Sequence, residues 1–249
     1  SNQIQTFELD QLNQLINQTI LTKGTQYPNP AVGAMVIDGA RIISDGYHQL
    51  AGQDHAEVIA LKKAGHLAKG ATLLITLEPC TVTGKTPACT DMIIRSGIAR
   101  VIWAINDPNP KITNTAKDIL SFHGIDVFDN VLPERGLECI KEFNAFQHLC
   151  RPYVYLKAAV SNDQMLAPDR NGLIYISSKQ SLDKVQQLRQ YCQAICVGVD
   201  TINIDLPRLS IRSKPIDQQP IIVVLDPKGL INREWLNTTL DNGRKVFLF

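Results

Sequence analysis

The sequence predicts an α/β protein with a three-layer α/β/α unit at 1–149 and a smaller, incomplete α/β unit at 150–249. Three observations lead to this expectation. The 249 residues exceed one average domain. Strand-like and helix-like segments alternate after an opening hairpin, which is typical of a sheet covered by helices on both faces. After Arg151-Pro152 the alternation starts again, but it stops before the further βα units that a parallel α/β domain normally contains.

Periodic segments in the first region are separated by glycine and proline. Apolar residues at helical spacing predict a helix over 7–23. Asp38-Gly39 is a hairpin-turn signal, so its flanking strands are expected at 31–37 and 41–47. The other expected elements are a helix from Asp54 to Ala64 with Asp54 as N-cap, a strand at 71–77, a helix ending at Ser96, a strand at 100–105, a helix at about 115–123, a short strand at 125–128 and a helix at about 133–148.

The second region has shorter segments of the same kind. Ser177 and Ser178 are helix-capping residues, and they predict a helix that runs to about Tyr191. The region contains no Gly-x-Gly-x-x-Gly fingerprint for a dinucleotide. Strands are expected at 153–160, 173–176, 194–199, 221–225 and 245–249, and the strand at 194–199 is expected to be buried.

Composition and charge argue against several classes of protein. The formal net charge is +1, so bulk electrostatics indicate neither a nucleic-acid nor a membrane partner. No apolar run is long enough to span a bilayer, and the start lacks a signal-peptide pattern. The six cysteines do not resemble a secreted disulfide framework. Apart from Cys80 and Cys89, we expect them to be reduced and mostly buried, in a cytosolic protein.

One group of residues indicates zinc chemistry. His55, Cys80 and Cys89 are side chains that bind zinc, and Glu57 adds a carboxylate. One imidazole and two thiolates leave a fourth tetrahedral position for water, as in catalytic zinc sites, and a carboxylate that is not a ligand can then move protons. The order H-x-E, then P-C and a second cysteine, is that of the zinc deaminases, although eight residues separate the cysteines here. The plainer interpretation is a surface histidine and two unrelated buried thiols.

Polar residues in three loops are candidates for holding a substrate. Asn29, Asp107 and Asn109 follow or precede strands whose ends are expected near the metal, and ligand sites in open α/β sheets gather at such ends. His48 opens the loop that leads to the helix expected from Asp54 to Ala64, which carries His55. Each of the Asn and Asp residues could instead be a turn-former that bonds its own backbone.

Motifs spread over the first region together resemble a known family. They are Pro28-Asn29-Pro30-Ala31-Val32-Gly33, Gly46-Tyr47-His48, His55-Ala56-Glu57, Thr76-Leu77-Glu78-Pro79-Cys80, Gly84-Lys85-Thr86-Pro87-Ala88-Cys89 and Asp107-Pro108-Asn109-Pro110. On these motifs the chain resembles the riboflavin-biosynthesis deaminase–reductase family, often called RibD, within the cytidine-deaminase-like zinc deaminases. The resemblance covers about 5–148 closely. It covers 151–249 more weakly, as the first part of the family's reductase domain.

The resemblance implies an activity and a set of roles. The family's first domain removes the 2-amino group of a phosphoribosylamino-pyrimidinone as ammonia. The roles implied here are zinc ligation by His55, Cys80 and Cys89, proton transfer by Glu57, and substrate binding by Asn29, His48, Lys85, Asp107 and Asn109. Lys85 would meet the phosphate as a mobile point charge, although a solvated loop lysine is the plainer interpretation. The family's second domain uses NADPH, and its members associate, so a homo-oligomer is expected.

The sequence departs from the family pattern in both regions. Val82 stands where the family usually has a histidine, and valine cannot supply that hydrogen bond. The stretch 111–115 replaces a glycine-bearing loop. In the second region the stretches at 161–165 and 169–175 lack family residues, whereas a site of Thr201, Asp205 and Arg212 is kept. We therefore expect weak or absent reductase activity and little NADPH binding.

Four interpretations remain open at this point. The first is a zinc deaminase of riboflavin synthesis with a vestigial or truncated reductase, and the second is a fragment of a complete bifunctional enzyme. The third is a deaminase of another amino-heterocycle, which Val82 favours and Lys85 disfavours. The fourth is a non-catalytic protein with a structural zinc, which three protein ligands instead of four disfavour.

Overall fold

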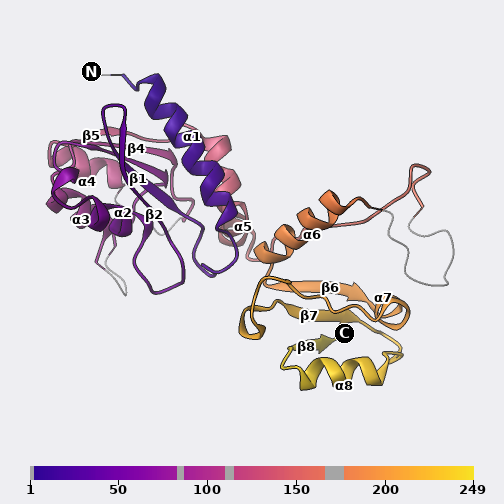
Figure 1. The fold of residues 1–249 in the computed structure, drawn as a ribbon. Coiled ribbons are helices and arrows are strands. Elements are labelled where there is room, and N and C mark those ends of the chain that lie inside the picture. The colour runs from indigo at the N-terminus through magenta and orange to yellow at the C-terminus, as the bar shows by residue number, and fades with distance from the viewer. Residues whose placement is uncertain (1–2, 83–86, 110–114, 166–176) are drawn as a thin grey trace. The chain divides into compact units, whose positions relative to one another are not determined.

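The computed structural model describes residues 3–82, 87–109, 115–165 and 177–249. The chain divides into two compact units, residues 1–154 and 155–249 (Figure 1). Each unit has its own sheet and its own apolar core.

The first unit is built on a five-stranded sheet with the strand order β2-β1-β3-β4-β5. β1 pairs antiparallel with β2 and with β3, whereas β3, β4 and β5 are parallel. This topology brings the start of β1 and the ends of β2, β3 and β4 to one edge of the sheet. The strands are β1 (Gly33–Asp38), β2 (Arg41–Tyr47), β3 (Thr72–Leu77), β4 (Arg100–Ile105) and β5 (Asp126–Phe128).

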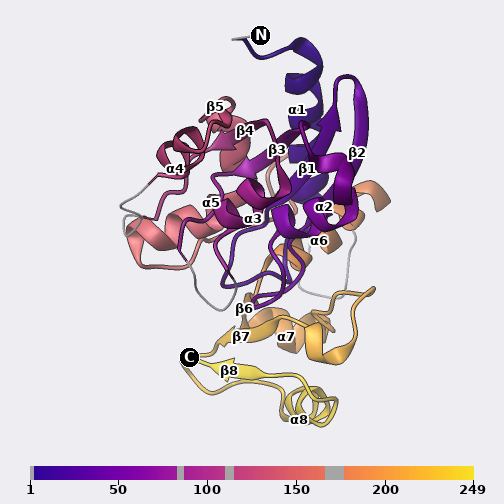
Figure 2. The ribbon, with the colours of Figure 1, turned by 90° about the vertical axis from the view of Figure 1, so that its left-hand side faces the viewer.

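Helices cover both faces of this sheet, which confirms the predicted three layers (Figures 1 and 2). The alternation of side chains along each strand divides the core, so that Leu73 packs on one face and Leu74 on the other. One face carries α1 (Thr6–Leu21) and α5 (Pro133–Leu149), and the other carries α2 (Ala56–Ala64), the short 3₁₀ helix η1 (Gly65–Ala68), α3 (Cys89–Ser96) and α4 (Ala116–Phe122).

A glycine allows α2 to lie close against β2. A Cβ added at Gly46 would lie 2.4 Å from the backbone oxygen of Ala56 and 2.7 Å from the backbone nitrogen of Ala60. These atoms belong to the first turns of α2, so the absence of a side chain at Gly46 sets how near this helix comes to the sheet. The hydroxyl of Ser44 adds a bond of 2.8 Å to the carbonyl of Ala60.

The second unit contains a three-stranded parallel sheet with the order β6-β7-β8. Its core gathers buried residues such as Ile202, Ile222 and Trp235. Its elements are α6 (Lys179–Tyr191), β6 (Ala194–Gly198), α7 (Val199–Asp205), the 3₁₀ helix η2 (Ile216–Gln218), β7 (Ile221–Leu225), α8 (Arg233–Asp241) and β8 (Val246–Leu248).

Several expectations for this region are wrong. Residues 153–160 form no strand, and Leu156 within them is 97% exposed. β6 is not buried, since its residues alternate between exposed and half-buried. Neither α7 nor α8 was expected. The strand expected at 173–176 lies outside the described residues.

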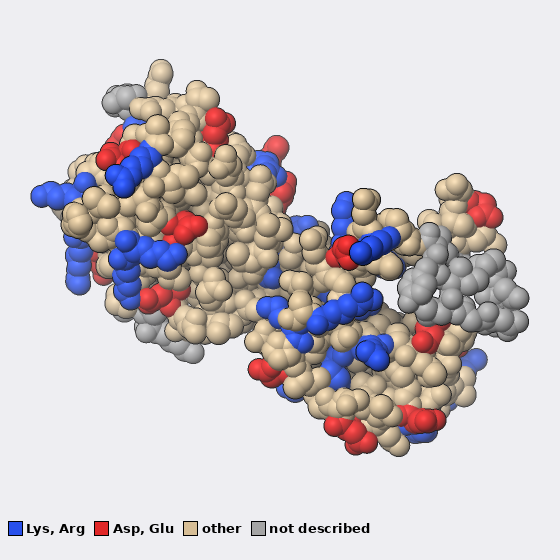
Figure 3. Space-filling view, viewed as in Figure 1, with Lys and Arg blue, Asp and Glu red and all other residues tan. Residues whose placement is uncertain are grey.

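Surface features of the described residues bear on the remaining expectations. All six cysteines are free, but Cys139 is the one buried thiol among the four outside the metal motif, so the expectation of mostly buried thiols is wrong. Cys196 is exposed because it lies on β6. On the face drawn in Figure 3, acidic and basic side chains are mixed across the first unit. Within the described ranges, no helix is both long and apolar enough to cross a bilayer.

Replacing Gly46 by alanine should destabilise the first unit by about 1–3 kcal/mol, because backbone atoms of α2 would have to move. Urea denaturation followed by tryptophan fluorescence measures this change. The matched control is Gly198→Ala, where an added Cβ has no atom within 4 Å and φ is −74°. A Gly46→Ala protein as stable as this control would contradict the close approach of α2.

Candidate metal centre

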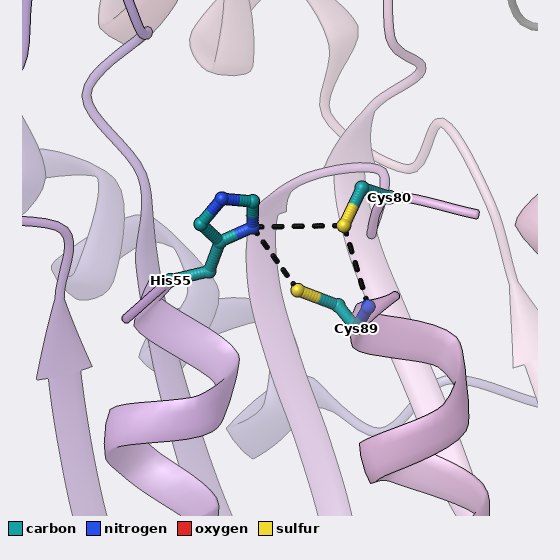
Figure 4. A group of neighbouring side chains, drawn as sticks. All are labelled: His55, Cys80 and Cys89. Carbon is teal, nitrogen blue, oxygen red and sulfur yellow. Dashed lines mark hydrogen bonds between the residues drawn. The ribbon is translucent and has the colours of Figure 1, made fainter. Parts of the chain in front are cut away.

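Three possible metal ligands converge from three separate segments (Figure 4). His55 is the N-cap of α2, Cys80 lies in the loop after β3, and Cys89 is the first residue of α3. The Nδ1 atom of His55 lies 3.2 Å from the Sγ of Cys89 and 3.6 Å from the Sγ of Cys80. The N-cap of α2 is His55 and not Asp54, one residue later than expected. The backbone of His55 is extended (ψ 160°), so its ring lies before the first turn of the helix.

The donor set and its spacing fit a zinc ion. Zinc–nitrogen and zinc–sulfur bonds of about 2.0–2.1 and 2.3 Å at tetrahedral angles place N and S roughly 3.6 Å apart. The three ligand atoms all lie within 4.8 Å of one another. Across the described residues, no fourth His, Cys, Asp or Glu joins the group, so its protein ligands number three.

Hydrogen bonds hold the sulfur of Cys80 in a thiolate-favouring environment. The backbone nitrogen of Cys89 donates to the Sγ of Cys80 over 3.3 Å, and the nitrogen of Thr90 donates to the carbonyl of Cys80 over 3.3 Å. The hydrogen bond from the Cys89 thiol, followed by that from His55, lowers the pKa of Cys80 to about 4. This lowered pKa favours the thiolate of Cys80, which is the form that binds a metal.

Glu57 is buried beside this group without belonging to it. Its side chain is in α2, 3% exposed, and forms a hydrogen bond with Cys89. Burial raises the pKa of Glu57, so this carboxyl holds a proton more readily than an exposed one. A carboxyl with a raised pKa next to a metal position is suited to accept and return a proton.

His48 and Asn29 form a bonded pair next to the metal group. The Nδ1 of His48 lies 3.1 Å from the carbonyl oxygen of Asp54, which can only accept, so this ring nitrogen carries the proton. The Nε2 of His48 therefore accepts from the Nδ2 of Asn29 over 3.0 Å. The rings of His48 and His55 lie edge to face with centroids 5.4 Å apart. Burial lowers the pKa of His48, which favours the neutral ring.

Asp107 and Asn109 lie at the same edge, after the end of β4. The Oδ1 of Asp107 accepts from the backbone nitrogen of Asn109 over 2.8 Å, so Asp107 stabilises its own turn, as the plainer interpretation expected. Burial raises the pKa of Asp107, and the nearby charges of Glu78 and Cys80 add to the increase.

Sequence reasoning missed three buried residues that frame the site. The Nε2 of Gln26 donates to the carbonyl of His48 over 2.9 Å, and the hydroxyl of Thr76 accepts from the nitrogen of Gly33 over 3.1 Å. The carboxylate of Glu78 accepts from two backbone amides in the segment after β4. A polar residue at an otherwise apolar strand end was the signal available for Thr76 and Glu78.

The remaining candidate residues lie outside the described residues, on the surface beside Cys80, or in the second unit. Lys85 lies outside the described residues. Val82 is 66% exposed, so it points to solvent rather than into the metal group. The candidates Thr201, Asp205 and Arg212 are all exposed on the second unit, where the charge of Arg212 contributes, after burial, to lowering the pKa of Arg189.

Two family descriptions match the chain. Residues 10–105 match the cytidine and deoxycytidylate deaminase zinc-binding region, and residues 152–247 match the RibD C-terminal domain. The chain is similar to the riboflavin biosynthesis protein RibD of Aquifex aeolicus, with 45% identity over 83% of this chain and 58% of that protein. For the protein of that name from Bacillus amyloliquefaciens, the identity is 40% over 91% of this chain and 61% of the relative. The chain thus spans about three fifths of these curated relatives.

Solved structures give the same result. A diaminohydroxyphosphoribosylaminopyrimidine deaminase/5-amino-6-(5-phosphoribosylamino)uracil reductase from Thermotoga maritima aligns with a TM-score of 0.84 and 35% identity over 98% of this chain and 69% of its own. RibD from Acinetobacter baumannii aligns with a TM-score of 0.76 and 29% identity over 97% of this chain and 74% of its own.

The ring of His48 should titrate below its ordinary pKa of 6.5, because burial disfavours the charged imidazole. NMR titration of the ring measures this. As the pH falls, His48 of the unfolded chain binds a proton at a higher pH than His48 of the folded protein. The stability contributed by neutral His48 is therefore present above about pH 6.5 and is lost as the pH falls through the lower pKa of the folded protein. Asn29→Ala removes the bond to Nε2 and should raise the pKa. A pKa of 6.5 in both proteins would contradict the assignment.

Proposed function

This chain belongs to the riboflavin-biosynthesis deaminase–reductase family, and from that premise we propose that residues 1–149 form a zinc-dependent hydrolytic deaminase. The proposed substrate is the family's phosphoribosylamino-pyrimidinone. The observation that carries the proposal is the position of Glu57, a buried carboxyl with a raised pKa beside a group of His55, Cys80 and Cys89 that lacks a fourth ligand among the described residues.

The residues of the site have complementary tasks in this reaction. His55, Cys80 and Cys89 would hold zinc, which when bound supplies a water activated near neutral pH. Glu57 accepts a proton from the attacking water and delivers a proton to the departing amino group, so that water is consumed and ammonia leaves. The raised pKa of Glu57 brings its proton affinity closer to that of the groups with which it exchanges protons.

Neutral polar groups at the same edge would hold the pyrimidine. Asn29 offers an amide whose orientation is set by its bond to His48, and Asp107 and Asn109 lie at the end of β4. We assign Lys85 to the phosphate from its place in the family motif. A neutral base or nucleoside has no negative group for this cation to bind, so Lys85 favours the phosphorylated substrate. Val82, which stands where the family usually has a histidine, favours a different amino-heterocycle.

A second activity is suggested by the match of 152–247 to the RibD C-terminal domain. The residues that would then contact NADPH, or the substrate of the reductase reaction, are Thr201, Asp205 and Arg212. The described part of residues 150–249 supplies a sheet of three parallel strands, and these three side chains are exposed. Cofactor sites in parallel sheets draw on the ends of several strands. We therefore propose weak NADPH binding by this 249-residue chain.

Glu57→Gln should keep zinc and lose ammonia release by about 10²–10⁴-fold, because an amide cannot take up and return the proton. Zinc is measured by atomic absorption and ammonia by a coupled assay. The matched control is Glu134→Gln, on the exposed side of α5, which should have the activity of the unchanged protein. Full activity in Glu57→Gln would rule out its assigned role.

Ammonia release should be fastest with the phosphoribosylated pyrimidine, compared with cytidine and guanine, because Lys85 adds attraction for a phosphate. Lys85→Gln should raise KM for the phosphorylated substrate and leave that for its dephosphorylated form unchanged. Faster turnover of cytidine or guanine would replace the proposed substrate by another amino-heterocycle.

NADPH titrated into the protein and followed by fluorescence should show no saturation at micromolar concentrations. The reason is that the described part of 150–249 offers the ends of only three parallel strands to the cofactor. Saturable micromolar binding would contradict the weak-binding proposal and would favour an active reductase unit.

A further inference from the structure

We propose that Glu78 is a positioning residue, which holds the substrate-side segment at Asp107 in a fixed place relative to the metal ligand Cys80. The inference rests on the proposed function and deepens it, because it names the group that couples the two halves of the site. Glu78 lies directly after β3, is 9% exposed and has no part in the proton transfers assigned to Glu57.

The carboxylate of Glu78 is shared between two segments of the chain. Its Oε2 accepts from the backbone nitrogen of Asp107 over 3.1 Å, and its Oε1 accepts from the backbone nitrogen of Ala116 over 2.9 Å. Asp107 follows β4, and Ala116 begins α4. One carboxylate therefore ties the segment after β4 to the end of β3 at two points, through charge-assisted bonds.

The backbone of Glu78 reinforces this connection. Its nitrogen donates to the carbonyl of Ile105 over 2.9 Å, which extends the pairing of β3 and β4 beyond the last strand residues. Because Cys80 is only two residues further along, the sulfur and the turn at Asp107 are both held by the same short stretch.

The carboxylate of Glu78 is explained by the two backbone amides that need an acceptor at this place. A buried carboxylate loses hydration, which two amide donors offset only in part. It also lies near the carboxylate of Asp107, and this repulsion adds to the effect of burial in raising the pKa of Asp107. An apolar residue would fill the same space without either cost, but it would leave the amides of Asp107 and Ala116 without an acceptor.

Glu78→Gln tests the proposal, because an amide keeps the size but presents one acceptor to two donors. We expect amide hydrogen exchange, read by NMR, to become at least roughly tenfold faster at Asp107 or Ala116, since a buried unsatisfied donor weakens the local structure. KM for the phosphoribosylated pyrimidine should rise roughly tenfold while kcat changes by less than about threefold and zinc content stays the same. Glu134→Gln, the matched control, should change none of these.

Glu78→Asp keeps the carboxylate with a shorter reach and should restore slow exchange at one of the two amides. Unchanged exchange in Glu78→Gln, loss of zinc with it, or an aspartate variant no better than the glutamine one would each overturn the proposal. If the unchanged protein releases no ammonia from the pyrimidine, the proposed function fails by itself, and the exchange rates still decide whether Glu78 holds the segment.

Discussion

The pairing of β3 with β1 and β4 is the constraint on which the site depends. Ala34 opposes Ile75 in the antiparallel pair, and Leu77 opposes Ile105 in the parallel pair. Because β1 runs against its neighbours, the chain enters β1 at the edge where β3 and β4 end. A slip of one residue in the pairing would exchange the two faces of β3, so that each side chain of the strand would pack on the opposite face of the sheet. The apolar residues of β3 therefore also fix the position of Cys80 relative to the ends of the neighbouring strands.

Much of the first unit could be predicted because its signals are local. The hairpin at Asp38-Gly39, the helical spacing in α1 and the apolar run of β3 each depend on residues that are neighbours in sequence. The grouping of His55, Cys80 and Cys89 as candidate ligands was also predictable, because His, Glu and Cys in that order have few common uses other than zinc chemistry. Their convergence was not predictable from the residues alone, since it depends on strand order.

The errors came from features that need a partner elsewhere in the chain. Residues 153–160 have strand composition, but composition supplies no neighbouring strand. Asn232 accepts a hydrogen bond from the nitrogen of Trp235 and was a usable cap signal for α8, although polar residues dominate that helix. Gln26 could not have been assigned, because only the folded chain brings the carbonyl of His48 near it. Glu78 was signalled by its place at the end of an apolar strand, but its two backbone partners were not predictable.

The place of the ligands at the starts of helices has a thermodynamic consequence. His55 and Cys89 are held by α2 and α3, and the sulfur of Cys80 is held by an amide of the latter helix. The conformational entropy of these side chains is therefore lost largely when the sheet and helices assemble, and little of it opposes the capture of an ion. In zinc fingers, by contrast, the ion itself drives folding. From the placement of His55, Cys80 and Cys89 on the assembled sheet and helices, we infer that a zinc ion would meet side chains already positioned by the fold.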